Sequence, residues 1–99
     1  MTLNEIKDDL KEIKFFNLNK KNFEEISQKI QNKRIIDTIA KYNLVMETAP
    51  LNVMEIYYYV YLKGLTYEGV AIDMRCCLDT VYKWHKELLL YLYECLNEA

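Results

Sequence analysis

The side chains most capable of chemistry in this chain are a single histidine, His85, and three cysteines. His85 lies between Trp84 and Lys86 with no second histidine and no Ser/His/Asp set, so we expect it at a surface or helix-cap position. Neither a glycine-rich phosphate loop nor a useful pair of carboxylates is present. We therefore expect no enzymatic activity, no catalytic residue and no cofactor.

The cysteines predict a reduced protein without a metal site. Cys76, Cys77 and Cys95 are odd in number, two are adjacent, and no Cys-x-x-Cys pair occurs. This arrangement disfavours a disulfide framework and a zinc site, and it suits a reducing cytoplasm. We expect Cys76 to be inert in the core. Cys77 is the candidate for a lowered thiol pKa, with Arg75 beside it as the cause.

Length and composition predict one small helical domain. The chain has 99 residues with only two Gly and one Pro, too few for the many turns of an all-β fold. It has no run of 18 apolar residues and no basic-then-apolar N-terminus. We therefore expect neither a membrane span nor secretion, and a cytoplasmic location.

Charge and aromatic content bear on the partners. The formal net charge is −2, from 13 basic and 15 acidic residues, so the composition does not indicate a broadly basic surface. Nine tyrosines are many for a small domain, which must bury them or present them to a partner. We expect a homodimer formed through the tyrosine-rich helices over 51–62 and 88–93.

The first part of the chain, residues 1–49, reads as an N-terminal helical pair for dimerisation or support. Thr2 begins a capping box for a helix over about 3–16, where apolar residues recur three and four apart. Asn22 suits the N-cap of a second helix. The apolar stripe of this second helix shifts near 32–34, so it either bends there or consists of two helices.

The second part, residues 50–99, begins at Pro50, the clearest boundary in the chain. A helix over 51–62 is apolar nearly all round and is therefore expected to be central. Gly64 supplies its left-handed C-terminal stop. The expected fold is thus all-α, with five to six helices.

The last third of the chain has the pattern of a helix–turn–helix. Thr66 caps a short helix that ends near Met74, a turn covers 75–77, and a final helix runs over about 78–96. Two helices that cross steeply need a small residue at their contact and a shared apolar core. The matching positions are Ala71 at the contact and Val70, Met74, Cys76, Val81 and Trp84 in the core.

Over about residues 43–96 the chain resembles region four of sigma factors, in the form used by small phage transcription regulators of the ArpU and RinA type. The resemblance implies sequence-specific binding of duplex DNA by a regulator of phage or mobile-element genes, in a bacterial or phage-infected bacterial cell. One departure is Arg75, which stands where the turn usually has glycine. The matching segments are Tyr61-Leu62-Lys63-Gly64, Thr66-Tyr67, Val70-Ala71 and Thr80-Val81-Tyr82.

The resemblance also implies which residues face DNA. Residues 78–87 would enter the major groove, and the preceding helix would contact the backbone. The residues expected to reach bases or phosphates are Thr80, Tyr82, Lys83 and Lys86, those expected on the backbone are Thr66, Tyr67 and Arg75, and the remaining outward positions are Cys77, Leu78 and Asp79.

Two other functions stay open. Residues 65–88 carry three basic against four acidic side chains, and phosphate neutralisation dominates DNA affinity. That balance favours a protein-interaction module that binds RNA polymerase, another phage protein or a host factor through Leu78 and Tyr82. A small terminase subunit of a phage also combines a helix–turn–helix with oligomerising helices, but we expect a larger, ring-forming chain for that role.

Overall fold

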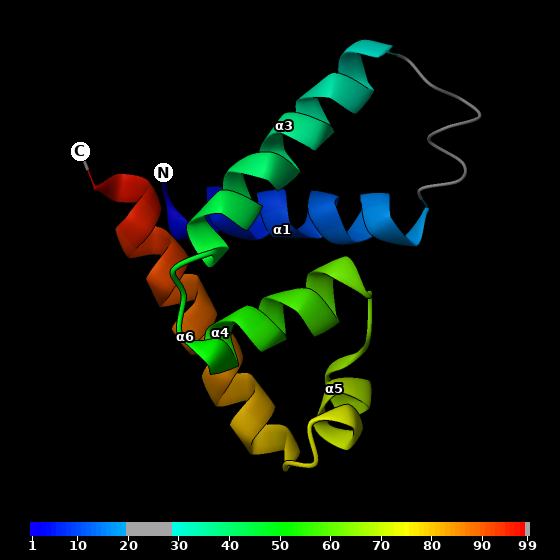
Figure 1. Ribbon diagram of the computed structural model, residues 1–99, viewed down its shortest axis with the longest axis vertical. Helices are drawn as coiled ribbons and strands as arrows, with labels where there is room; N and C mark the ends of the chain where they lie inside the picture. The colour runs from blue at the N-terminus through cyan, green and yellow to red at the C-terminus, as the bar shows by residue number, and fades with distance from the viewer. Residues whose placement is uncertain (20–28, 99) are drawn as a thin grey trace.

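The computed structural model describes residues 1–19 and 29–98, without the side chains of residues 29–32. Throughout these ranges the chain is all-α and contains no strand, as the sequence predicts. Figure 1 shows the arrangement of the helices. Their bounds are α1 (Leu3–Leu18), α3 (Lys29–Met46), α4 (Leu51–Ile56), the π-helical segment η1 (Tyr57–Leu62), α5 (Tyr67–Asp73) and α6 (Leu78–Asn97).

Helix α1 begins as predicted, with a reciprocal cap. The Thr2 hydroxyl accepts from the Glu5 backbone N–H at 3.2 Å, and the Glu5 carboxylate accepts from the Thr2 N–H at 3.1 Å. The apolar stripe is fully buried, as shown by Ile6, Leu10 and Ile13 at 0–1% exposure. The predicted cap at Asn22 lies outside the described residues.

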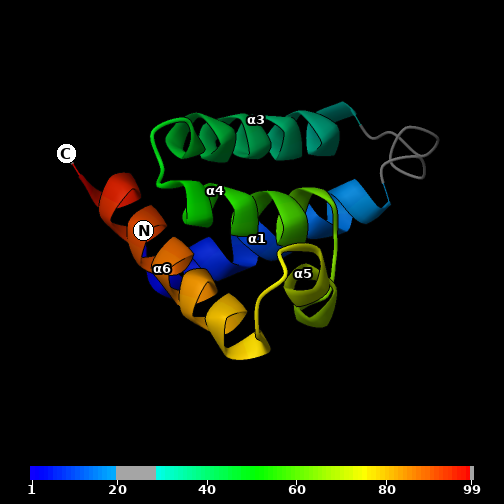
Figure 2. The ribbon, with the colours of Figure 1, turned by 60° about the horizontal axis from the view of Figure 1, so that its bottom comes forward.

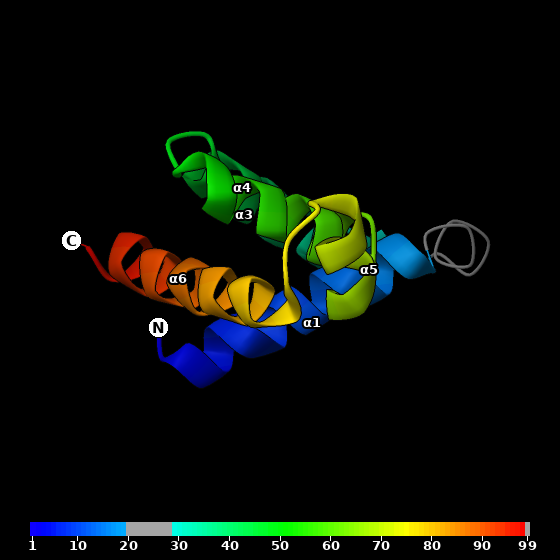
Figure 3. The same cartoon turned by 90° about the horizontal axis from the view of Figure 1, so that it is seen from below.

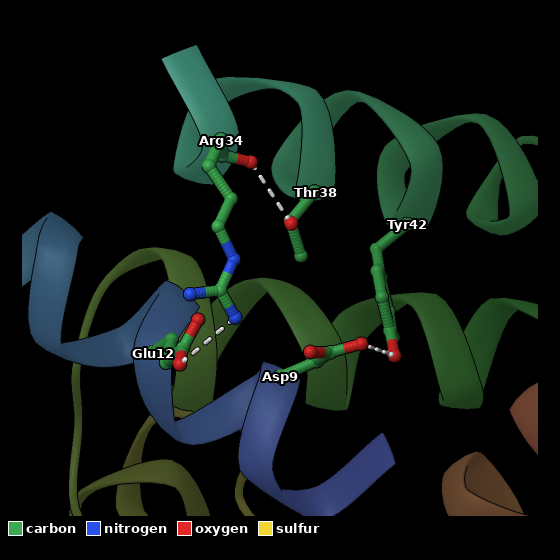
Figure 4. Close-up of polar contacts among 5 residues, drawn as sticks. All are labelled: Asp9, Glu12, Arg34, Thr38 and Tyr42. Carbon is green, nitrogen blue, oxygen red and sulfur yellow. Dashed lines mark hydrogen bonds and ion pairs between the residues drawn. The ribbon is translucent and has the colours of Figure 1, made fainter. Parts of the chain in front are cut away.

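Helix α3 rests mainly on α1, through polar contacts at the edge of the core (Figure 4). The hydroxyl of the fully buried Tyr42 donates to Asp9 Oδ2 at 2.7 Å. Arg34 Nη2 lies 3.6 Å from Glu12 Oε1, but both side chains are well exposed, so this ion pair adds little stability. The acidic side of α1 therefore faces α3.

The predicted central helix over 51–62 is continuous, but its second half widens. After α4, Tyr57–Leu62 form η1, and Lys63 N–H donates to the Tyr58 carbonyl, five residues back, at 2.8 Å. Gly64 then ends the helix with φ +76°, as expected. Only one side of the helix over 51–62 is buried. Its buried residues are Val53, Ile56, Tyr57, Val60 and Tyr61.

One hydrophobic core joins both parts of the chain. Its fully buried members include Leu10 of α1, Tyr42 of α3, Ile56 of α4 and Leu88 of α6. Helices α3 and α4 lie on one side of the molecule and α1 and α6 on the other (Figures 2 and 3). Among the helices in the described ranges, none has both the length and the apolar character that crossing a membrane requires.

Candidate nucleic-acid interface

The helix–turn–helix begins at Thr66, the N-cap of α5. The Thr66 hydroxyl accepts from the Gly69 N–H at 3.1 Å and so satisfies one of the unpaired donors of the first turn. Val70 is fully buried, and Ala71 packs partly buried against the core. Helix α5 is thus anchored through one face, as the spacing in the sequence predicts.

The turn between α5 and α6 contains a left-handed residue, Arg75, with φ +52°. Backbone hydrogen bonds close it on both sides, from Met74 N–H to the Val70 carbonyl at 2.8 Å and from Cys76 N–H to the Ala71 carbonyl at 3.0 Å. An L-residue in this region clashes through its Cβ, which is why glycine is usual there. Arg75 therefore holds a strained backbone.

Helix α6 begins after Cys77 and is held along its whole length. Val81, Leu88 and Leu92 are fully buried, against α5 at the start of the helix and α4 and α1 further along. On the α4 side, Asn52 Nδ2 donates to Glu87 Oε2 at 2.8 Å. This anchoring fixes which side of the helix faces outward.

The residues that the sequence predicts for DNA contact fall into two groups. Seven are exposed, one at the N-cap of α5 and six on the turn and the outward face of the start of α6, whereas Tyr67, Leu78 and Thr80 are half-buried. The exposed group thus presents three positive charges and one negative charge. Its members are Thr66, Arg75, Cys77, Asp79, Tyr82, Lys83 and Lys86.

His85 is not at a surface or cap position, as the sequence led us to expect. It is half-buried between η1, α5 and α6, and its Nε2 forms a hydrogen bond with the Tyr61 hydroxyl. The Tyr67 hydroxyl lies 3.4 Å from the same nitrogen, and the Tyr67 ring meets the Tyr82 ring edge-on, 5.2 Å between centroids. Sequence alone missed this cluster because its members come from three separate elements.

The cluster is electrostatically coupled to α1. Burial lowers the pKa of His85, and the charges of Lys7 and Lys14 lower it further. His85 is therefore neutral at pH 7. The two lysines act on it because α1 packs directly against α6.

The thiol of Cys77 has a lowered pKa, as expected, but for another reason than the sequence gave. Hydrogen bonds from Thr80 cause the lowering, since its hydroxyl lies 3.0 Å from Cys77 Sγ. Arg75 does not contribute. Cys76 packs partly buried against the core, in line with its predicted place between the helices.

A basic stripe on α1 completes the surface, and the sequence reading passed over it. Lys7, Lys11 and Lys14 are spaced at i, i+4 and i+7, which places them on one face of the helix. Within the described part of the chain, none of the three forms an ion pair, and Asp9 and Glu12 face α3 on the other side of α1. The spacing by itself would have revealed the stripe, whereas its closeness to α6 needed the fold.

Comparisons with protein families, with curated proteins and with solved structures found no match for this chain. The likeness to sigma factor region four and to the ArpU and RinA regulators therefore stays a prediction made from residues. The function has to be argued from the geometry of the helix–turn–helix and its surroundings.

Proposed function

We propose that this protein binds duplex DNA through α5 and α6 and regulates transcription of phage or mobile-element genes. The observation that carries the proposal is the turn at Arg75. Its left-handed backbone, with Val70 and Val81 fully buried on either side, fixes α5 against the start of α6. The outward face of α6 is thereby left free for a groove.

In this proposal the first three turns of α6 enter the major groove, which is wide enough to admit a helix. Lys83 and Lys86 supply the positive charge, and the ring of Tyr82 is kept in place by Tyr67. Arg75, in the turn, reaches a phosphate of the flanking backbone. Phosphate contacts fix the register of the helix, and base contacts specify the sequence.

The helix–turn–helix itself carries little positive charge, and the lysine stripe of α1 adds to it. Lys7 and Lys14 are near enough to α6 to depress the pKa of His85, and Lys11 lies between them on the same face. Three more positive charges beside the proposed binding helix would neutralise further phosphates and release their counterions. In the proposal, α1 is a second, sequence-independent contact with DNA.

Binding to a pool of labelled random duplexes at two salt concentrations tests the proposal. We expect one sequence to be selected and the affinity to fall steeply as salt rises. Failure to bind any duplex at low salt would refute DNA binding.

Variants then locate the interface. Lys83→Ala with Lys86→Ala should weaken binding and flatten the salt slope by about two, one for each lost phosphate contact. Lys7→Ala with Lys11→Ala should weaken binding to all sequences equally. Lys41→Ala is the matched control, because this exposed lysine lies on α3 and its loss should change neither affinity nor slope.

A protein-interaction module is the second candidate, and a feature of α6 favours it. Beyond Lys86 the outward face becomes apolar, with Leu90 and Tyr93 48% and 43% exposed. Such a stripe suits RNA polymerase, another phage protein or a host factor better than a phosphate backbone. Replacing Leu90 and Tyr93 by alanine distinguishes the candidates, because DNA binding should survive these changes and protein binding should not.

A further inference from the structure

The outward face of α3 carries large apolar side chains that are exposed in the described part of the chain. Ile36 is 54% exposed and Leu44 is 66% exposed, and Ala40 lies exposed between them. Helix α3 packs mainly on α1, and its opposite side forms the periphery of the molecule (Figures 1 and 2). Paired apolar residues of this size on a free helix face indicate an interface.

The residues along this face are arranged symmetrically about Ala40. Ile36 and Leu44 lie four residues to either side, and the exposed Lys33 and Glu47 lie seven residues to either side. At 100° per residue, the four positions inside α3 fall within about 80° of one another, and Glu47 follows in the turn directly after the helix. We name them the α3 seam.

A seam of this kind is complementary to itself. When two copies of α3 lie antiparallel with Ala40 facing Ala40, each Ile36 meets a Leu44 and each Lys33 meets a Glu47. The small side chain at the centre lets the helices approach closely, and opposite charges close both ends. Self-complementarity about a two-fold axis is the requirement for an isologous dimer.

We propose that the α3 seam is a dimer interface, occupied by the seam of a second copy of this chain. The sequence predicted a dimer through the tyrosine-rich helices. In the arrangement proposed here α3 forms the centre, and the tyrosine segment η1 borders it. The proposal does not depend on DNA binding.

An open apolar groove of about 460 Å³ extends the seam on the side of η1 and α4. Glu47 belongs both to the seam and to the wall of the groove, so the pairing brings the partner's Lys33 to a rim that also holds Glu55. A stable interface takes about 20 residues a side, so the five residues of the seam are too few by themselves and the residues of the groove would have to take part. The other lining residues are Asn43, Met46, Met54, Tyr57, Tyr58, Tyr59 and Leu62.

Sedimentation of the purified full chain over the micromolar range tests the proposal. We expect a concentration-dependent dimer. Leu44→Asp should weaken it by more than about 100-fold, because two charges are buried in each dimer. Ile72→Asp is the matched control, because Ile72 is a still more exposed apolar residue on α5 (76%) whose replacement should leave the dimer unchanged.

A charge swap tests the register. Lys33→Glu alone and Glu47→Lys alone should each weaken the dimer by about tenfold, because two like-charge pairs replace two opposite ones. The double variant should return to within about threefold of the original affinity. Circular dichroism of every variant checks that the helical fold is kept.

Two results would overturn the proposal. If the chain stays monomeric at every concentration, a second copy does not occupy the α3 seam, and a different protein would be its partner. If the double charge variant forms a weaker dimer than either single variant does, the two copies pair through another surface.

Discussion

Replacing Arg75 by glycine should stabilise the protein, even though it removes a large side chain. Arg75 holds φ +52°, and the left-handed region costs a residue with a Cβ about 1–2 kcal/mol. Glycine avoids this cost but loses about 0.5–1 kcal/mol through the greater freedom of its unfolded chain. The exposed Arg75 side chain forms no ion pair with any described residue, so its removal forfeits no such contact.

The net expectation is a gain of about 0.5–1 kcal/mol in the free energy of unfolding, or an increase of about 2–8 °C in Tm. Urea and thermal unfolding of the Gly, Asn and Ala variants measure it. Asn tolerates the left-handed region better than Ala does, so the expected order of stability is Gly, then Asn, then Ala. A glycine variant no more stable than the alanine variant would refute the strain argument.

Three further perturbations follow from single contacts. Gly64→Ala should lower the free energy of unfolding, measured in urea, by at least about 2 kcal/mol, because φ is +76° and the new Cβ would overlap Leu18. A loss below about 0.5 kcal/mol would mean that the backbone at residue 64 adjusts without strain. Tyr42→Phe should cost about 1–1.5 kcal/mol through the lost hydrogen bond to Asp9, and an unchanged denaturation midpoint would contradict this. Since burial lowers the pKa of His85 in the folded state, the unfolded chain takes up its proton first as pH falls below about 6.5. Stability should therefore decline as the pH falls below about 6.5, and His85→Gln should remove part of that decline. An equal decline in both proteins would show that other groups cause it.

Local signals located the elements that the structure bears out. The capping box at Thr2, the stop at Gly64 and the cap at Thr66 act within one helical turn, so neighbouring residues suffice to identify them. At Arg75 the resemblance placed a non-glycine residue where glycine is usual, which left open a strained backbone or a differently shaped turn, and φ +52° shows the strained backbone. These features belong to backbone stereochemistry and hydrogen-bond satisfaction, which depend little on the rest of the fold.

Other features required the packed molecule. The sequence predicted one helix over 51–62, but Tyr57–Leu62 widen into a π-helical segment. The hydroxyl of the buried Tyr57 also finds a partner in Asn43 Oδ1 of α3, at 2.8 Å. Such partners come from other elements, and local periodicity carries no information about them.

The sequence by itself determined that this protein is helical, where four of its helices begin, and that α5 and α6 form a helix–turn–helix. Caps, apolar spacing and breakers decide these points because each acts over a few neighbouring residues. Only the tertiary structure decided that His85 is half-buried beside Tyr61, that the lysines of α1 adjoin α6, and that Ile36 and Leu44 are exposed. Burial and charge proximity arise between segments distant in the chain, so they exist only once the helices have packed together.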